Sequence, residues 1–553
     1  MINSIKTYCL GIDFGTDSVR CLLINALDGF EVAASVYDYP RWKEGLYCNA
    51  GDARFRQHPM DYIQSLEAVV KDVLDKVDPA IRSQICSLSM DTTGSSPAPV
   101  DRNGTPLALL PAFKDDPDAM FYLWKDHTAI REAIEINSFV DSEQLPYLDY
   151  VGGYYSPEWF WSKLLHLLRK ESKVAKACYS WVEHADWMPF LLTGGRDVHQ
   201  LKRGICAAGH KALWSAKWNG FPPDSFWKGI DPLLSGFADR ISKDVYTSDQ
   251  PAGTLSEQWA TRLGLSTDVK VGIGALDAHM GAVGGQIEPY YLSKVMGTST
   301  CDMLVAPSVE IGDKLVHGIC GQVPDSIIPG MIGMEAGQSA FGDVYAWFRD
   351  FLLEPLRLAG LDTRSVEDIK NTLLPRLNEQ AIGISTEEWN GLPISLDWFN
   401  GRRSPDVNPL LKAATMGMHL GTSTVHIFAS LVEATCFGSK AIVERFLKMN
   451  IPVKGVIGVG GISHKSDFVM QTLANVLGRP IKISGSHQSG ALGAAMFGAT
   501  LSGIYPDVSS AMMKMGKGFV RVYEPDPAMT TLHNQRYIQY QSLGNYIQSG
   551  SAQ

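Results

Sequence analysis

The stretch LGIDFGTDSVRCLLIN, residues 10–25, decides the fold. Two apolar runs flank a glycine-threonine turn, a pattern that predicts two strands joined by a hairpin. Glycine lets backbone N–H groups approach a phosphate closely, and a following hydroxyl adds another donor. We therefore expect the hairpin tip to bind part of a nucleoside triphosphate, through Gly15, Thr16, Asp17 and Ser18.

An aspartate, Asp13, lies directly before this tip. A carboxylate beside a phosphate loop repels the phosphates unless a divalent cation lies between them. Mg²⁺ prefers carboxylate oxygens and phosphates as ligands, so Asp13 is the expected metal residue. An ordinary hairpin with a solvated aspartate is the alternative, and a motif this short does not decide between the two.

A second copy of the hairpin pattern occurs in KVMGTSTCDMLVAP, residues 294–307. Its turn lies 282 residues after the first one, about half the chain, and its expected phosphate contacts are Gly297, Thr298 and Ser299. The position that matches Asp13 is Val295, so one tip carries a charge and the other does not. The repeat predicts two similar lobes whose tips face each other, with domains at residues 1–287 and 288–553.

Composition restricts the classes of function. The chain has 553 residues, 45% of them hydrophobic, and a formal net charge of -10, which disfavours nucleic acid as a partner. No apolar run is long enough for a membrane helix. The 9 cysteines include no C-x-x-C pair, and the N-terminus shows no secretory signal pattern. We expect a cytoplasmic protein that acts on small molecules.

Alternating apolar runs and helical periods indicate an α/β fold. The stretch at residues 57–77 predicts a helix behind Pro59, and Ser156-Pro157-Glu158 has the residue types of a helix start. At residues 453–481 an apolar strand runs into Gly460-Gly461, and a helix follows from Ser466 to Gly478. This diglycine turn leaves room for a base and ribose. The small-residue helix after it, SGALGAAMFGATLSG, is expected to pack behind the loop.

These elements together resemble the FGGY carbohydrate kinases, which belong to the actin-like, ribonuclease-H-like ATPase superfamily. The resemblance covers nearly the whole chain, and beyond the hairpins and the diglycine loop it includes YYSPEWFWSKLLHLL, LDWFNGRRSP and GMHLGTSTVHIFASLVEATCFGSKAIVERF. A closer likeness within the family is carried by PRWKEG, MDTTGSSPAPVD, LWKDHTA, CAAGHKALW, GALDAHMGAVG, GTSTCD and GMEAGQSAFGDVYAWF. The family resemblance implies a two-domain fold with an interdomain cleft and the use of ATP with Mg²⁺. The motifs are most similar to those of the branch that phosphorylates the ketopentose ribulose on its terminal hydroxyl.

The resemblance also implies the site residues. Asp277 matches the catalytic base of the family, while Gly94, Lys211, Glu335 and Asp277 match the sugar contacts. The three side chains each have an alternative: Asp277 as a helix cap, Lys211 as a surface charge and Glu335 as an acid at a helix start. The nearby His279 is expected to be structural. Asp126 is a weaker candidate for a sugar contact.

Two rival functions remain open from the sequence. One is a kinase of the same family that acts on xylulose, glycerol or another polyol. The other is a non-catalytic or filament-forming actin-like ATPase, which needs no base directed at a polyol. The expected partners are a sugar and ATP, with no nucleic acid and no membrane, and a homodimer is left open.

Overall fold

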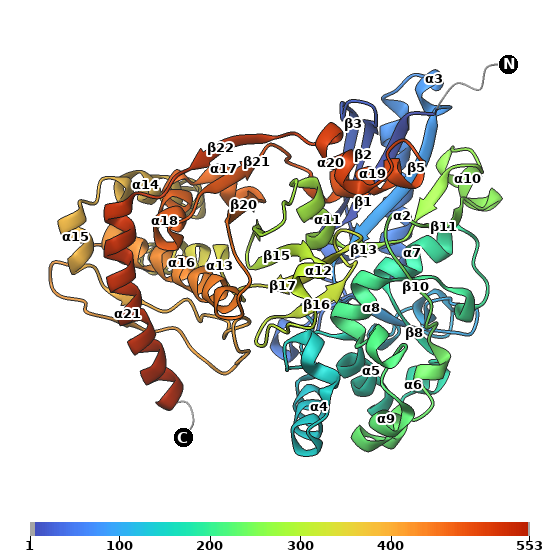
Figure 1. The fold of residues 1–553 in the computed structure, drawn as a ribbon, viewed down its shortest axis with the longest axis horizontal. Coiled ribbons are helices and arrows are strands. Elements are labelled where there is room, and N and C mark those ends of the chain that lie inside the picture. Colours follow the sequence, from blue (N-terminus) through green and yellow to red (C-terminus); the bar gives the residue numbers. More distant parts are fainter. Residues whose placement is uncertain (1–5, 551–553) are drawn as a thin grey trace.

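The computed structural model describes residues 6–550, and its two halves lie side by side (Figure 1). The first half is built on a sheet with the strand order β11-β12-β5-β1-β2-β3, and β13 pairs with β5. Its strands are β1 (Tyr8–Phe14), β2 (Ser18–Asn25), β3 (Glu31–Asp38), β5 (Ile85–Thr92), β11 (Pro251–Thr254), β12 (Lys270–Gly272) and β13 (Ala275–Leu276).

The second half is built on a sheet with the order β16-β17-β15-β14-β20-β21-β22. Its strands are β14 (Tyr291–Met296), β15 (Thr300–Pro307), β16 (Gly321–Pro324), β17 (Met331–Ala336), β20 (Gly455–Val459), β21 (Ile481–Ser484) and β22 (Phe519–Tyr523). Four short strand pairs lie outside both sheets among the described residues: β4 (Arg56–Gln57) with β7 (Phe121–Tyr122), β6 (Pro97–Val100) with β8 (Ser180–Glu183), β9 (Arg203–Gly204) with β10 (Val245–Tyr246), and β18 (Ile394–Ser395) with β19 (Thr415–Met416).

The two large sheets repeat one pattern of neighbours. In the first, β1 pairs antiparallel with β2 and parallel with β5. In the second, β14 pairs antiparallel with β15 and parallel with β20. The outer pairs also match, because β12 and β21 extend each sheet in parallel and β11 and β22 close it antiparallel. The internal repeat predicted from the two turns is therefore confirmed, while the division at residue 288 stays a prediction.

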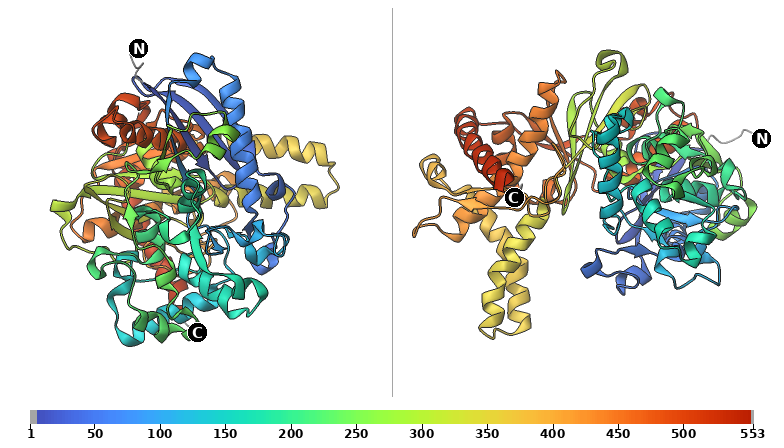
Figure 2. Two further views of the ribbon diagram at one scale, coloured as in Figure 1. Left: turned by 90° about the vertical axis from the view of Figure 1, so that its right-hand side faces the viewer. Right: turned by 90° about the horizontal axis from the view of Figure 1, so that it is seen from below.

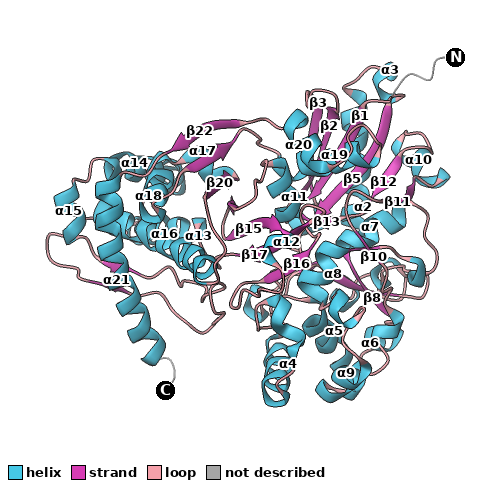
Figure 3. Ribbon diagram, viewed as in Figure 1, coloured by secondary structure: helices cyan, strands magenta, loops and turns pink. Residues whose placement is uncertain are grey.

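Helices surround these sheets (Figure 3). Those of the first half are α1 (Pro40–Lys43), α2 (Pro59–Asp75), α3 (Pro79–Arg82), α4 (Ile130–Glu143), α5 (Phe160–Arg169), α6 (Lys173–Ala177), α7 (His184–Leu192), α8 (Ile205–Ala212), α9 (Asp224–Ile230), α10 (Glu257–Leu263) and α11 (Asp277–Gly284). Those of the second half are α12 (Ser308–Ile311), α13 (Gly342–Leu358), α14 (Thr363–Ile382), α15 (Thr386–Gly391), α16 (Thr424–Lys448), α17 (Gly461–Lys465), α18 (Asp467–Leu477), α19 (Ser489–Leu501), α20 (Val508–Met515) and α21 (Pro527–Gly550). The pair α13–α14 projects from the second half (Figure 2).

Two predicted helices are confirmed and one start is wrong. α2 begins at Pro59, and α18 begins after its cap Ser466 and ends before Gly478. α5, however, begins at Phe160 with Trp159 as its cap, so residues 156–158 precede the helix. Proline and a capping serine favour a helix start. Glu158, however, contacts residues distant in the sequence, and these contacts are described below.

The small-residue helix α19 does not pack behind the diglycine loop, contrary to expectation. It lies against β1, β5 and α11 of the first half, where Gly11 and Gly284 touch its backbone directly. A Cβ at either glycine would collide with a carbonyl oxygen of α19. The small residues therefore serve a close approach between the two halves, and the second half of the sequence supplies a layer to the first sheet.

Three further expectations concern the whole chain. Within residues 6–550 no helix combines the length and the apolar character needed to cross a bilayer. All 9 cysteines lie in the described part and are free. Tryptophans of the first half mainly fill the core, as expected: buried are Trp159, Trp161, Trp181, Trp187, Trp227 and Trp259.

Candidate active site

Both predicted hairpin tips are formed. In the first, the Gly15 amide donates to the carbonyl oxygen of Ser18 at 3.0 Å. In the second, the Gly297 amide donates to the carbonyl oxygen of Ser299, also at 3.0 Å. Gly297 and Thr298 are exposed, so their backbone is accessible to a ligand. That these tips bind phosphates stays a prediction.

Neighbouring segments fix the position of each tip. The hydroxyl of Thr16 accepts a hydrogen bond from the indole of Trp124 at 3.0 Å, and the carboxylate of Asp17 accepts one from Trp42 at 2.7 Å. The carbonyl oxygen of Thr298 accepts two amide hydrogen bonds from the segment that opens α13. The tips are therefore held before any nucleotide arrives, which lowers the entropy cost of ordering a binding loop.

Three carboxylates lie at the carboxyl ends of neighbouring parallel strands. Asp13 near the end of β1 is the register partner of Asp91 in β5, and Ala275 of β13 is the partner of Asp91 on the other side. Asp277 follows β13 as the first residue of α11. Asp91 is fully buried, Asp13 is 7% exposed and Asp277 is partly exposed. Asp91 was not predicted, because its role depends on a strand partner 78 residues away.

The environment of Asp277 suits proton transfer. Its carboxylate accepts a hydrogen bond from the amide of Ala278 at 2.7 Å, and Leu276 rather than Asp277 is the cap of α11. Burial, followed by the negative charge of Asp13, raises the pKa of Asp277 to about 7. A general base is most efficient when its pKa lies near the working pH. These features support Asp277 as the base and weigh against a capping role.

The two predicted sugar-contact side chains form an ion pair with each other. Lys211 on α8 donates to both carboxylate oxygens of Glu335 on β17, at 2.6 and 2.8 Å. Lys211 is 3% exposed and Glu335 is 5% exposed. Glu335 is therefore a strand residue and Lys211 is not a surface charge, so neither alternative holds. The pair joins the two halves of the protein.

Two histidines lie beside this pair. Nδ1 of His210 and Nε2 of His279 are 3.6 and 3.7 Å from the same carboxylate oxygen of Glu335. Burial lowers the pKa of His279 to about 4 and that of His210 well below its usual value, so both rings are neutral at pH 7. The three side chains lie close enough to hold a metal ion. The ammonium group of Lys211 already neutralises the carboxylate, which disfavours a cation there.

Gly94 and Asp126 differ in what they offer to a sugar. Gly94 is partly exposed and packs on Leu276, directly before Asp277, so its backbone lies beside the expected base. Asp126 is fully buried; its carboxylate pairs with Arg56 and accepts hydrogen bonds from neighbouring backbone and hydroxyl groups. Its acceptor positions are occupied by the protein, which favours a structural role.

The diglycine turn is formed at the end of β20. Gly460 has a φ of +94°, and a Cβ there would lie 2.7 Å from the carbonyl oxygen of Met296, next to the second tip. Such a backbone conformation strongly favours glycine. A Cβ at Gly461 would meet no heavy atom within 4 Å. The open space beside this turn agrees with the predicted adenosine position.

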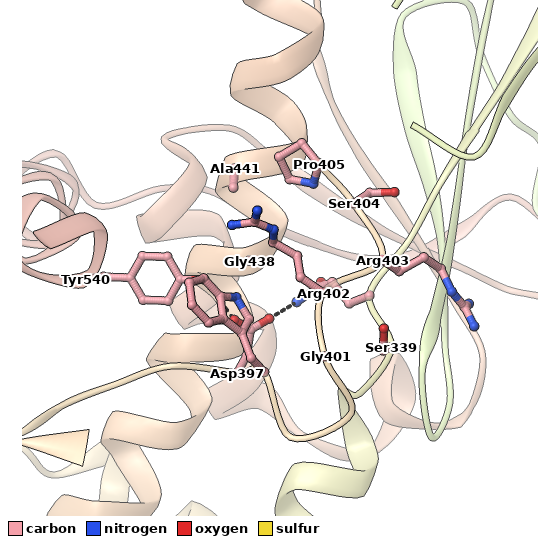
Figure 4. Close-up of a pocket in the computed structure, with 12 residues that line it drawn as sticks. Ser339, Asp397, Gly401, Arg402, Arg403, Ser404, Pro405, Gly438, Ala441 and Tyr540 are labelled. Atoms are coloured by element: carbon pink, nitrogen blue, oxygen red, sulfur yellow. Dashed lines mark hydrogen bonds between the residues drawn. The ribbon is translucent and has the colours of Figure 1, made fainter. Parts of the chain in front are cut away.

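A second contact between the halves was not predicted from the sequence. Arg403 donates to both carboxylate oxygens of Glu158, at 3.2 and 3.4 Å, and His127 lies 2.9 Å from one of them. Figure 4 shows the Arg403 side chain pointing away from the cavity that its neighbours line. That cavity has a volume of about 20 Å³, room for roughly one water molecule, and so it is not a substrate site.

The comparisons with known proteins give the family. Residues 292–502 match the model of the FGGY family of carbohydrate kinases, C-terminal domain. The chain is 45% identical over 552 residues to a ribulokinase of Vibrio parahaemolyticus, covering 99% of this chain and 97% of that protein. The chain belongs to the FGGY family of carbohydrate kinases.

Further similarities agree with this assignment. A ribulokinase of Bacillus licheniformis is 33% identical over 543 residues, which cover 96% of this chain and 95% of that protein. Among solved structures, a xylulose kinase from Lactobacillus acidophilus has a TM-score of 0.78 at 18% identity, with 99% of each chain covered. A gluconate kinase from the same organism has a TM-score of 0.76 at 18% identity, with 98% of each chain covered. The two-domain actin-like fold predicted from the sequence is confirmed.

The residues of this FGGY kinase fit a magnesium ion. Carboxylate oxygens are the ligands that Mg²⁺ prefers, and the site offers Asp13 beside the first tip. Asp91 adds a buried carboxylate whose two oxygens have no hydrogen-bond partner within residues 6–550. An acid in this state indicates that a partner is missing from the protein itself. Asp13 and Asp91 are therefore the residues suited to the ion.

Proposed function

We propose that this kinase transfers the γ-phosphoryl group of ATP to the terminal hydroxyl of ribulose, giving ribulose 5-phosphate and ADP. The observation that carries the proposal is the 45% identity to a protein named ribulokinase over 99% of the chain. The geometry supports it, because the structure combines a candidate base at the start of α11, a buried ion pair between α8 and β17, and two formed hairpin tips. L-ribulose is the first substrate to test, with D-ribulose beside it, and the pathway is pentose or arabinose catabolism.

Asp277 is the base in this reaction. Its carboxylate takes the proton of the terminal hydroxyl, the new oxygen–phosphorus bond forms, and the bond from phosphorus to the β-phosphate bridging oxygen breaks to release ADP. The backbone at Gly94 lines the sugar next to the base. Lys211 and Glu335 direct their remaining hydrogen-bonding capacity to the hydroxyls of the polyol.

ATP is held by three backbone elements in this proposal. The tips at Gly15–Ser18 and Gly297–Ser299 donate to phosphate oxygens, and the adenosine lies against Gly460 and Gly461. Asp13 would hold Mg²⁺, which would supply charge neutralisation for the phosphates. We further expect the enzyme to act in the cytoplasm, and a homodimer is the assembly to test.

An assay of ADP release tests the substrate. Purified protein is mixed with Mg·ATP and with L-ribulose, D-ribulose, xylulose or glycerol, and ADP is measured by a coupled enzyme reaction. We expect ribulose to exceed glycerol in kcat/KM by at least about 100-fold, because sites that read hydroxyl groups discriminate strongly against ligands that lack them. Equal rates with xylulose or glycerol would reject ribulose as the substrate and leave the carbohydrate kinase assignment in place.

A further inference from the structure

Asp91 is a buried acid whose charge the protein does not satisfy. Its side chain is fully buried, and both carboxylate oxygens lack a hydrogen-bond partner within residues 6–550. Other buried acids differ in this respect. Glu433, for example, pairs with His533 at 2.8 Å and with Arg536 at 2.7 Å. An unpaired buried carboxylate is costly, so retaining one at this position calls for a ligand.

The strand register brings Asp91 to Asp13. Paired residues of neighbouring parallel strands point to the same face of the sheet, and Asp13 and Asp91 are such partners. Both carboxylates face the start of α19, because a Cβ at Gly490 would lie 3.0 Å from an oxygen of Asp13 and 3.3 Å from one of Asp91. Glycine at this position therefore lets the backbone of α19 lie directly against the two acids.

The nearest cationic side chain, Arg20, forms a hydrogen bond with only one of the two acids. Arg20 donates to the carboxylate of Asp13 at 3.1 Å, while its own side chain is 44% exposed. Within residues 6–550, Asp91 therefore has neither a hydrogen-bond donor nor an ion-pair partner.

We propose that Asp91 is a second carboxylate for the Mg²⁺ ion that accompanies ATP, acting together with Asp13. This inference rests on the proposed use of Mg·ATP. Mg²⁺ is commonly held by one or two carboxylates, phosphate oxygens and water, and Asp13 with Asp91 supplies such a pair. The role of Asp277 is separate, because it stays on the sugar side next to Gly94. The competing explanation is a proton shared between Asp13 and Asp91.

Metal binding is measured directly in the test. Mn²⁺ serves as the probe, and its free concentration is followed by electron paramagnetic resonance in the presence of a non-hydrolysable ATP analogue. We expect Asp91→Asn to weaken Mn²⁺ binding at least about 10-fold relative to wild type. Asp38→Asn is the matched control, since it removes an exposed carboxylate from the end of β3 in the same sheet and is expected to leave Mn²⁺ binding unchanged.

A second readout does not depend on the metal. In EDTA and without nucleotide, we expect Asp91→Asn to melt at the same temperature as wild type or higher, because an amide carries no buried charge. If Asp91→Asn does not fold, Asp91→Ser takes its place in both measurements. Wild-type affinity for Mn²⁺ in a folded Asp91 variant would overturn the proposal and favour the shared proton.

The Mn²⁺ measurement does not depend on which sugar the enzyme phosphorylates. If wild type does not phosphorylate ribulose but Asp91→Asn still loses Mn²⁺ affinity, the substrate is wrong and the metal role stands. If wild type phosphorylates ribulose and Asp91→Asn binds Mn²⁺ normally, the proposed function stands and the metal role is wrong.

Discussion

Breaking the ion pair between Lys211 and Glu335 separates its contribution to stability from its contribution to sugar selection. Lys211→Met leaves the buried Glu335 carboxylate without its partner. Removing one member of a buried pair costs about 3–5 kcal/mol. The pKa of Glu335 gives a similar figure: burial opposes ionisation, but Lys211, followed by His210 and His279, lowers the value from 4.5 to about 2, which corresponds to roughly 3 kcal/mol.

The double variant Lys211→Met/Glu335→Leu is the critical one. Replacing a buried ion pair with apolar side chains is often neutral or stabilising, so we expect it to regain most of the stability that Lys211→Met loses. Its preference for ribulose over glycerol should nevertheless be lost, because no charged group remains to bind the hydroxyls. Thermal unfolding and kcat/KM for both substrates measure the two effects.

Two results would refute this reasoning. One is a Lys211→Met protein as stable as wild type, and the other is a double variant that still prefers ribulose about 100-fold. Lys217→Met is the matched control, since its ion pair with Asp313 is exposed to solvent and contributes little to stability. The pH dependence of the stability also has a defined sign. Because the folded pKa of Glu335 is lowered, its stabilisation is present above pH 4.5 and is lost as the pH falls toward 2.

Four more outcomes are expected. Asp277→Asn should lower kcat by about 10²–10⁴ and leave the Kd values of ATP and sugar unchanged, whereas a kcat near wild type would exclude it as the base. With wild type, kcat/KM for the sugar should fall as the pH drops below about 7, since Asp277 must be ionised, and a flat profile from pH 5.5 to 8 would contradict this. Asp13→Ala should raise the Mg²⁺ concentration needed for half-maximal rate, and superimposed titrations of variant and wild type would reject the metal role. Arg403→Gln should raise the KM of the sugar several-fold by releasing Glu158. Arg402→Gln is the control, since its contacts lie at the surface, and it should leave this KM unchanged. If Arg403→Gln and wild type have equal KM values, the contact between the halves does not affect sugar binding.

Local patterns were predictable from the sequence. The two hairpins, α2 and α18 depend on turn residues, caps and apolar periodicity within about 20 residues, and all are present. The equivalence of the two sheets followed from two turns with the same residues. Asp277, Lys211 and Glu335 came from motif resemblance, because no local pattern distinguishes them from a capping acid, a surface lysine or a helix-start acid.

The packing of distant segments was not predictable. The sequence of α19 predicts a helix but not the surface on which the helix packs. Only the three-dimensional arrangement brings it to Gly11 of the first strand. Asp91 gains its significance from strand register, and Arg403 from the approach of the second half to Glu158. A serine and a proline before Glu158 suggested a helix start, but the ion pair with Arg403 holds that glutamate in a different role.

The two groups of charged residues depend differently on the arrangement of the halves. Asp13, Asp91 and Asp277 all come from the first sheet and its adjoining helix, so the proposed base and the proposed metal ligands belong to one half of the protein. The pairs Lys211–Glu335 and Glu158–Arg403 each need both halves. A displacement of the halves therefore disturbs sugar contacts before it disturbs the carboxylates. Substitutions at the contact between the halves should consequently change KM for the sugar, whereas substitutions within the carboxylate group should change kcat and the metal requirement.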